Sequence, residues 1–136
     1  MDLRFAHLAD YASADASGKL TVVGVFDFIW DNLKQRPIPF PPCHLVASFS
    51  GSVAEGSQHQ VEIQFVDADE KPVLPALRAA LLFNPFGPGF PLRAQLIIGY
   101  GPGVLHVPDL GDYHFRFLVD GRELGQLQVS ALEPLR

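Results

Sequence analysis

Residues 111–121 read Gly-Asp-Tyr-His-Phe-Arg-Phe-Leu-Val-Asp-Gly, and this stretch decides the fold class. Large apolar side chains recur at every second position from Tyr113 to Val119, and a histidine and an arginine lie between them. In an extended chain, successive side chains point to opposite faces, so a repeat of two residues puts all the apolar side chains on one face. This stretch is therefore predicted to be a half-buried β-strand. The Asp120-Gly121 step that follows is typical of a tight hairpin turn.

The same period recurs along most of the chain. Strands are predicted at residues 3–12, 20–28, 44–50, 59–66, 92–98, 113–119 and 126–131. Residues 79–83 are interpreted as a further strand, although Pro75 could equally begin a short helix there. Residues 3–12 and 20–28 flank a Ser17-Gly18 turn and are expected to pair as a hairpin. About eight short strands predict one antiparallel all-β sandwich over residues 1–136, immunoglobulin-like or jelly-roll-like.

Composition limits the classes of function. The chain has 136 residues, 48% of them hydrophobic, which is enough for a packed core. Ten Lys and Arg against fifteen Asp and Glu give a net charge of -5, so nucleic acid is an unfavourable partner. The lone Cys43 and the lack of a secretory N-terminus favour the cytoplasm. The longest apolar run, residues 20–30, is too short to span a membrane.

Residues 21–29 carry large apolar side chains on both predicted faces. One face is predicted to hold Val22, Phe26 and Phe28, and the other Val23, Val25 and Ile29. A sandwich needs to bury only one face of such a strand. A partner subunit is therefore one candidate cover for the second face.

Two proline-rich loops, residues 36–42 and 84–91, place aromatic and aliphatic side chains among prolines. In one interpretation these side chains plug the open ends of the sandwich, and in the other they form a preordered apolar contact surface. The predicted interaction surface, for a homo-oligomer or a protein partner, consists of Val23, Val25, Ile29, Ile38, Phe40, Phe86 and Phe90.

No set of residues in the sequence carries a recognisable catalytic chemistry. The five histidines are scattered singly, and there is no Gly-x-Ser-x-Gly elbow. Cys43 stands beside His44, but a buried, inert thiol is favoured over a nucleophile. We therefore assign no catalytic residue, no cofactor and no metal site.

Two other motifs have structural interpretations. Asp67, Asp69 and Glu70 place three carboxylates at a turn, where a solvated turn is favoured over a cation site and cation binding stays open. Asp109-x-Gly111-x-Tyr113 is similar to the tyrosine corner of immunoglobulin-like sandwiches, in which the phenol hydroxyl bonds backbone a few residues upstream.

The chain resembles a bacterial family of small proteins to which no activity is assigned. The likeness rests on three stretches in the N-terminal half: Ala9-Asp10-Tyr11-Ala12, a Gly18-Lys19-Leu20 turn and a Gly24-Val25-Phe26-Asp27 strand. It continues through Phe40-Pro41 and Val107-Pro108 and ends in Gly111-x-Tyr113-x-Phe115 and Val119-Asp120-Gly121, whereas residues 72–91 match poorly. The resemblance implies a fold and a bacterial source, and it carries over no functional residue.

Three functional hypotheses remain open. The first is a non-enzymatic interaction or assembly module, favoured by the missing catalytic sets and the apolar surfaces. The second is a small-ligand or carbohydrate-binding sandwich that uses Trp30, Tyr100 and loop carboxylates. The third is a hydrolase whose site is assembled only in three dimensions.

Overall fold

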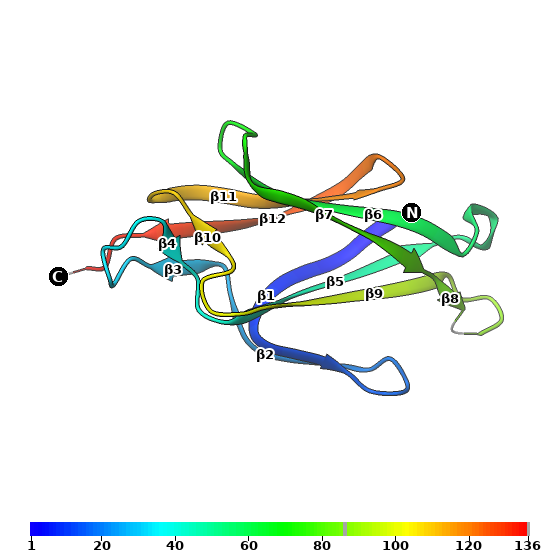
Figure 1. The fold of residues 1–136 in the computed structure, drawn as a ribbon. Helices are drawn as coiled ribbons and strands as arrows, with labels where there is room; N and C mark the ends of the chain where they lie inside the picture. The colour runs from blue at the N-terminus through cyan, green and yellow to red at the C-terminus, as the bar shows by residue number, and fades with distance from the viewer. Residues whose placement is uncertain (86, 136) are drawn as a thin grey trace.

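The chain folds into two β-sheets that pack face to face (Figure 1). The computed structural model describes residues 1–85 and 87–135, and divides them into twelve strands and one 3-10 turn, η1 (Val53–Glu55). The first sheet, called the β1 sheet, has the order β2 (Leu20–Phe26), β1 (Asp2–Ala14), β5 (Cys43–Gly51), β9 (Leu92–Tyr100), β8 (Asn84–Pro85). The second, called the β11 sheet, has the order β3 (Phe28–Trp30), β12 (Arg122–Leu132), β11 (Gly111–Val119), β6 (Gln58–Asp67), β7 (Pro72–Leu82).

The all-β sandwich predicted from the sequence is confirmed. Among the described residues, eight strands have seven or more residues, which is the number predicted. Pro75 lies within strand β7, so the strand interpretation of residues 79–83 is confirmed and the helical alternative is wrong. All pairings are antiparallel except that of β3 with β12, which is parallel. None of the described residues form a helix with the length and apolar character to cross a bilayer.

Strand β11 lies at the centre of its sheet, between β12 and β6, and its apolar face lines the interior of the sandwich. Tyr113, Phe115, Phe117 and Val119 are all buried, as predicted. Phe115 packs on Phe65 of β6 with ring centroids 4.5 Å apart. At the end of the strand Val119 pairs with Arg122, so the predicted Asp-Gly hairpin turn is confirmed. Both turn residues have positive φ angles, 51° and 83°, as a type I′ turn requires.

The first two strands pair as the predicted hairpin, but the second strand ends earlier than predicted. β2 stops at Phe26, and residues 28–30 join the other sheet as β3, beside β12. Because the chain changes sheets at Asp27, the single alternation expected for residues 21–29 is wrong. Ile29 turns into the core, whereas Phe28 and Trp30 are exposed.

The proline-rich segment of residues 36–42 closes one end of the sandwich. Its short strand β4 (Ile38–Pro39) pairs with β10 (His106–Val107) in a separate two-stranded sheet. The Phe40 amide donates to the carbonyl of Leu105 at 2.9 Å. Ile38 and Phe40 are buried at that end of the core.

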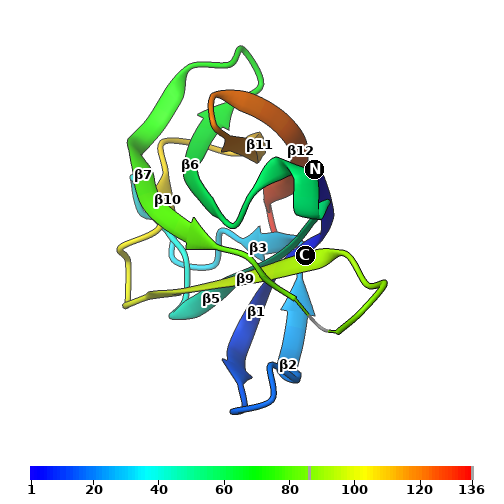
Figure 2. The ribbon, with the colours of Figure 1, turned by 90° about the vertical axis from the view of Figure 1, so that its right-hand side faces the viewer.

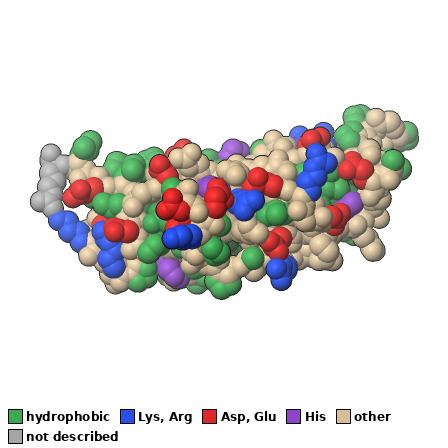
Figure 3. Space-filling view, turned by 90° about the horizontal axis from the view of Figure 1, so that it is seen from above, with side chains coloured by type: hydrophobic (Ala, Val, Ile, Leu, Met, Phe, Trp, Pro, Cys, Tyr) green, Lys and Arg blue, Asp and Glu red, His purple; other side chains and the backbone are tan. Residues whose placement is uncertain are grey.

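The middle of the outer face of the β11 sheet is polar, in contrast to the outer side of the β1–β2 hairpin. Arg116 on β11 contacts Glu123 at 2.6 Å and Glu70 at 3.7 Å, and Arg78 on β7 contacts Glu62 at 2.7 Å. Red and blue side chains accordingly alternate across the middle of this face in Figure 3. The β1–β2 hairpin extends away from the β11 sheet (Figure 2), and its outer side carries exposed Tyr11, Val23 and Val25. A partner would therefore meet charged side chains on the first of these surfaces and apolar side chains on the second.

Candidate functional site

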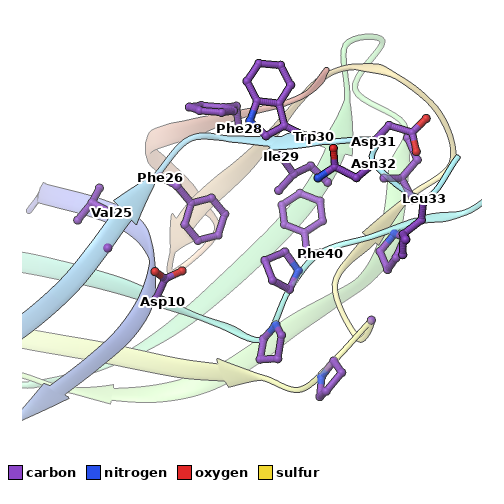
Figure 4. Close-up of a pocket in the computed structure, with 17 residues that line it drawn as sticks. Asp10, Val25, Phe26, Phe28, Ile29, Trp30, Asp31, Asn32, Leu33 and Phe40 are labelled. Carbon is purple, nitrogen blue, oxygen red and sulfur yellow. The ribbon is translucent and has the colours of Figure 1, made fainter. Parts of the chain in front are cut away.

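An apolar cleft opens where the chain crosses from the β1 sheet to the β11 sheet. Residues 24–26 and 28–33 form one wall, and residues 38–42 form the other. Asp10 of β1 and the turn at residues 102–103 complete the lining. The cleft has a volume of about 680 Å³, which is in the range of ligand-binding pockets. We call it the β3 cleft (Figure 4).

Backbone hydrogen bonds to β12 hold the wall that contains β3. The Ser130 amide donates to the carbonyl of Asp27 at 2.9 Å, and the Asp31 amide donates to that of Leu132 at 2.9 Å. This parallel pairing fixes which side chains face inward. Ile29 contributes to the core, and Phe28 and Trp30 pack edge to face on the exposed side, with ring centroids 5.2 Å apart.

The predicted interaction surface is divided by the structure. Val25, Ile29, Ile38 and Phe40 all line the β3 cleft. Ile29, Ile38 and Phe40 are buried, however, so the prediction that they are exposed contact residues is corrected. They belong to the cleft wall and the core because they close the end of the sandwich. Of the exposed contact surface predicted here, only Val25 remains in this group.

The other predicted surface residues lie outside the cleft. Val23 is exposed on β2 and pairs with Tyr11 of β1. Phe90 is exposed in the loop before β9, which Figure 1 places at the opposite end of the sandwich from β3. Phe86 lies outside the described residues. The structure therefore does not join the two proline-rich loops into one surface.

Sequence reasoning missed Asp10 and Leu33 as members of the site. Leu33 follows β3 and is 74% exposed on the cleft wall. Asp10 is the one charged residue between buried Leu8 and Ala12 on the inner side of β1. This break in an apolar alternation was the available indication, together with Gly24 in the partner strand.

The second carboxylate in the cleft, that of Asp31, is held by one cation. It is buried and lies 2.9 Å from the Arg36 guanidinium, which also reaches Asp109 at 3.2 Å. The hydrogen bond to Asp31 raises the pKa of Arg36. A buried carboxylate held in this way anchors the loop after β3, because removal of its cation would leave a buried charge.

Cys43 lies beneath the cleft region, at the start of β5, and its thiol is not activated. It is free and buried. Burial raises its pKa to about 11, and the negative charge of Asp10 adds to this effect. A thiol that stays protonated at neutral pH is a poor nucleophile.

His59 and Asp120 form a histidine–carboxylate pair elsewhere on the β11 sheet. His59 Nδ1 lies 2.5 Å from Asp120 Oδ2, and Nε2 lies 3.0 Å from the Gly56 carbonyl oxygen. Both neighbours are acceptors, so the doubly protonated ring fits the site, and the bond to Asp120 raises the pKa of His59. A ring that donates from both nitrogens has no lone pair for base catalysis. This pair is structural.

The two motifs with structural interpretations are placed as follows. The Tyr113 hydroxyl donates to the Asp109 carbonyl at 2.6 Å, so the predicted tyrosine corner is confirmed. In the turn after β6, Asp67 Oδ1 accepts the amides of Asp69 and Lys71. Glu70 faces His114 and Arg116. In residues 1–85 and 87–135 no three metal-ligating side chains cluster.

Fold and cleft together define a β-sandwich domain with an open apolar cleft at one end. The chain belongs to DUF6941, a family of unknown function, whose model matches residues 4–131. No curated protein matches the chain.

Proposed function

We propose that this domain is a non-enzymatic interaction module that binds a partner protein at the β3 cleft. The observation that carries the proposal is the apolar rim of the cleft. Val25, Phe28, Trp30 and Leu33 all have exposed side chains there, between 41% and 74%. Contiguous exposed apolar surface around a cleft marks an interaction site.

The rim also favours a protein over a small ligand. A small molecule inside the cleft would contact the walls at Ile29 and Phe40 and leave Leu33 and Trp30 exposed to water. A protein surface would cover wall and rim together, as aromatic residues are covered at the centre of interfaces. The rival hypothesis of a small-ligand site predicts that only the residues of the inner wall contribute to binding.

The cleft offers little to a catalytic mechanism, which supports the non-enzymatic interpretation. Its thiol neighbour, Cys43, has a raised pKa, and the Asp31 carboxylate is engaged by Arg36. Nucleophilic catalysis requires an activated nucleophile with a base in reach. The lone, unpaired Cys43 also supports a reducing compartment, and we propose the bacterial cytoplasm.

Site-specific photo-crosslinking tests the proposal. A benzophenone amino acid at position 33, in cells that naturally make the protein, is expected to give a discrete adduct with one protein. Position 53 on η1 is the matched control, because Val53 is 73% exposed and Leu33 74%. Trp30→Ala should reduce the adduct at position 33. Equal adducts at both positions, or none, would contradict the proposal.

A second candidate function is self-assembly through the outer side of the β1–β2 hairpin. Tyr11 and Val23 are paired neighbours on the two strands, and Val25 continues the row on β2. All three are more than half exposed. β2 is also an edge strand, and edges with apolar side chains favour association with another chain. A benzophenone amino acid at position 23, on this row and outside the cleft lining, should then give an adduct with a second copy of the chain.

A further inference from the structure

Asp10 occupies a position in the β3 cleft that the strand pattern reserves for an apolar residue. Side chains at every second position of a strand share a face, so Leu8, Asp10 and Ala12 point to the same side of β1. Leu8 and Ala12 are buried in the interior. The carboxylate between them therefore lies on the inner side of the hairpin, where it lines the cleft.

Gly24 makes room for this carboxylate. It lies opposite Asp10 in β2, between the paired positions Val23 and Val25, and has a φ of 71°. A Cβ atom at position 24 would collide with the Asp10 carboxyl group. The glycine and the aspartate are thus matched to each other across the two strands.

The Asp10 carboxylate has no cation within the described part of the chain. No Lys, Arg or His forms an ion pair with it there, although Asp31, Glu62 and Glu123 each have an arginine partner. Asp10 is exposed at the cleft and its charge is open to a ligand. The chain as a whole adds a net charge of -5, which favours a cation.

Aromatic rings stand beside the carboxylate. Figure 4 shows the Asp10 carboxylate turned toward the Phe26 ring, with the Phe40 ring beside Phe26 and the Trp30 ring on the opposite side of β3. An aromatic face attracts an organic cation, and a carboxylate at the same place adds a direct charge interaction. A metal ion would need several oxygen ligands, which one carboxylate does not supply.

From this complementarity we propose that the partner places a basic side chain, lysine or arginine, against Asp10, with an apolar neighbour on the cleft wall. This inference rests on the proposed function, because it describes the segment that enters the same cleft. The ammonium or guanidinium group would lie between Asp10 and Phe26. Its apolar neighbour would pack on the part of the cleft wall that Phe26 and Phe40 contribute.

Three probes of similar shape and different charge test this inference. They are the 2-phenylethylammonium cation, neutral 3-phenylpropanamide and the 3-phenylpropanoate anion. Trp30 is the only tryptophan of the chain, so its fluorescence reports on the cleft directly, and amide chemical shifts identify the bound region. We expect the cation to bind about five-fold more tightly than the amide, and the anion most weakly.

Two matched variants locate the effect. Asp10→Asn should remove the advantage of the cation over the amide. Asp69→Asn removes the same charge from the turn after β6, away from the cleft lining, and should preserve the advantage. Circular dichroism and unaltered amide shifts outside the cleft would show that both variants fold.

The outcomes separate this inference from the proposed function. Equal affinities for the cation and the amide would overturn the inference that the partner presents a basic side chain, and would leave the cleft as a binding site. If Asp69→Asn reduced the preference for the cation as much as Asp10→Asn does, the inference would also be overturned, because the preference would then come from net charge alone. If no probe changes Trp30 fluorescence or any cleft amide, the inference fails, whereas the proposed function is decided by the crosslink at position 33.

Discussion

At the scale of single residues, Tyr113 joins the start of β11 to the segment before it. Its hydroxyl donates to the Asp109 carbonyl at 2.6 Å and accepts the Asp109 amide at 3.3 Å. Asp109 also contacts Arg36, whose other acidic partner is Asp31 in the cleft lining. The tyrosine corner therefore supports the loop that carries the cleft wall.

Tyr113→Phe tests this anchor. Loss of the hydroxyl should lower the free energy of unfolding by about 1 kcal/mol, the usual net worth of one such hydrogen bond. Urea denaturation measures this change as a lower midpoint at unchanged slope. Tyr11→Phe is the control, because Tyr11 is 51% exposed and should tolerate the same deletion. Equal midpoints for the two variants would show that the corner contributes nothing.

His59 gives the fold a pH dependence. Its pKa is raised in the folded protein, first by the hydrogen bond to Asp120 and also by the Gly56 carbonyl. The folded state therefore binds the proton more tightly than the unfolded chain. This stabilisation is complete below the ordinary histidine pKa of 6.5 and is lost as the pH rises through the folded-state value.

Asp120→Asn should flatten this dependence. Asparagine tolerates the positive φ of residue 120, but its amide does not favour the imidazolium as a carboxylate does. We expect the loss of stability above pH 6.5 to be smaller in the variant than in the wild-type protein. NMR titration of the His59 ring should show a lower pKa in the variant. Identical titration curves would mean that Asp120 does not stabilise the charged ring.

At the scale of elements, the β1–β2 hairpin depends on the match between Gly24 and Asp10. Gly24→Ala forces an L-residue to a positive φ and drives its Cβ atom into the carboxylate. We expect a loss of about 2 kcal/mol or more in the free energy of unfolding. Thermal and urea melts measure this loss.

Gly18→Ala separates the two causes. Gly18 has a φ of 84°, and a Cβ atom there meets nothing within 4 Å, so only the backbone cost of about 1 kcal/mol remains. In an Asp10→Ala background, Gly24→Ala should cost clearly less than with Asp10 present, because only the Cβ of residue 10, at 3.1 Å, remains close. If the two glycine variants are equally stable with Asp10 present, the proposed match is wrong.

The alternation of apolar and polar residues predicted the strands because each sheet buries one face. Tyr113 to Val119 and the Asp120-Gly121 turn followed from local rules alone. The crossing at Asp27 did not, because residues 20–30 keep an unbroken extended pattern in the sequence. Which sheet a strand joins depends on long-range pairing, here that of Ile29 with Ala131.

The candidate site was harder to predict for the same reason. Val25, Ile29, Ile38 and Phe40 were selected from the sequence for their apolar character, and the fold does bring them to one cleft. Their burial could not be predicted, because β4 and β10 are separated by 66 residues of chain between Pro39 and His106. Asp10 was missed because its meaning depends on Gly24 across the hairpin.

At the scale of the whole molecule, the two outer faces have different chemistry. The outer face of the β11 sheet carries ion pairs of Arg78 with Glu62 and of Arg116 with Glu123, which are compatible with contact with water. The outer side of the β1–β2 hairpin has exposed Tyr11, Val23 and Val25 instead. An apolar row on an edge strand favours a two-fold contact between copies, since each copy then covers the same row of the other.

Sedimentation of the purified protein tests this contact. If the hairpin row is an interface, the wild-type protein should sediment as a dimer at micromolar concentration. Val23→Lys should give folded monomers, because it would bury an unpaired ammonium group at the contact, at a cost of several kcal/mol. Val23 lies outside the cleft lining, so this variant should still bind the cleft probes. Val53→Lys adds the same charge on η1 and should remain dimeric. A wild-type protein that stays monomeric at high concentration would exclude self-assembly through the hairpin and leave the β3 cleft as the proposed contact surface.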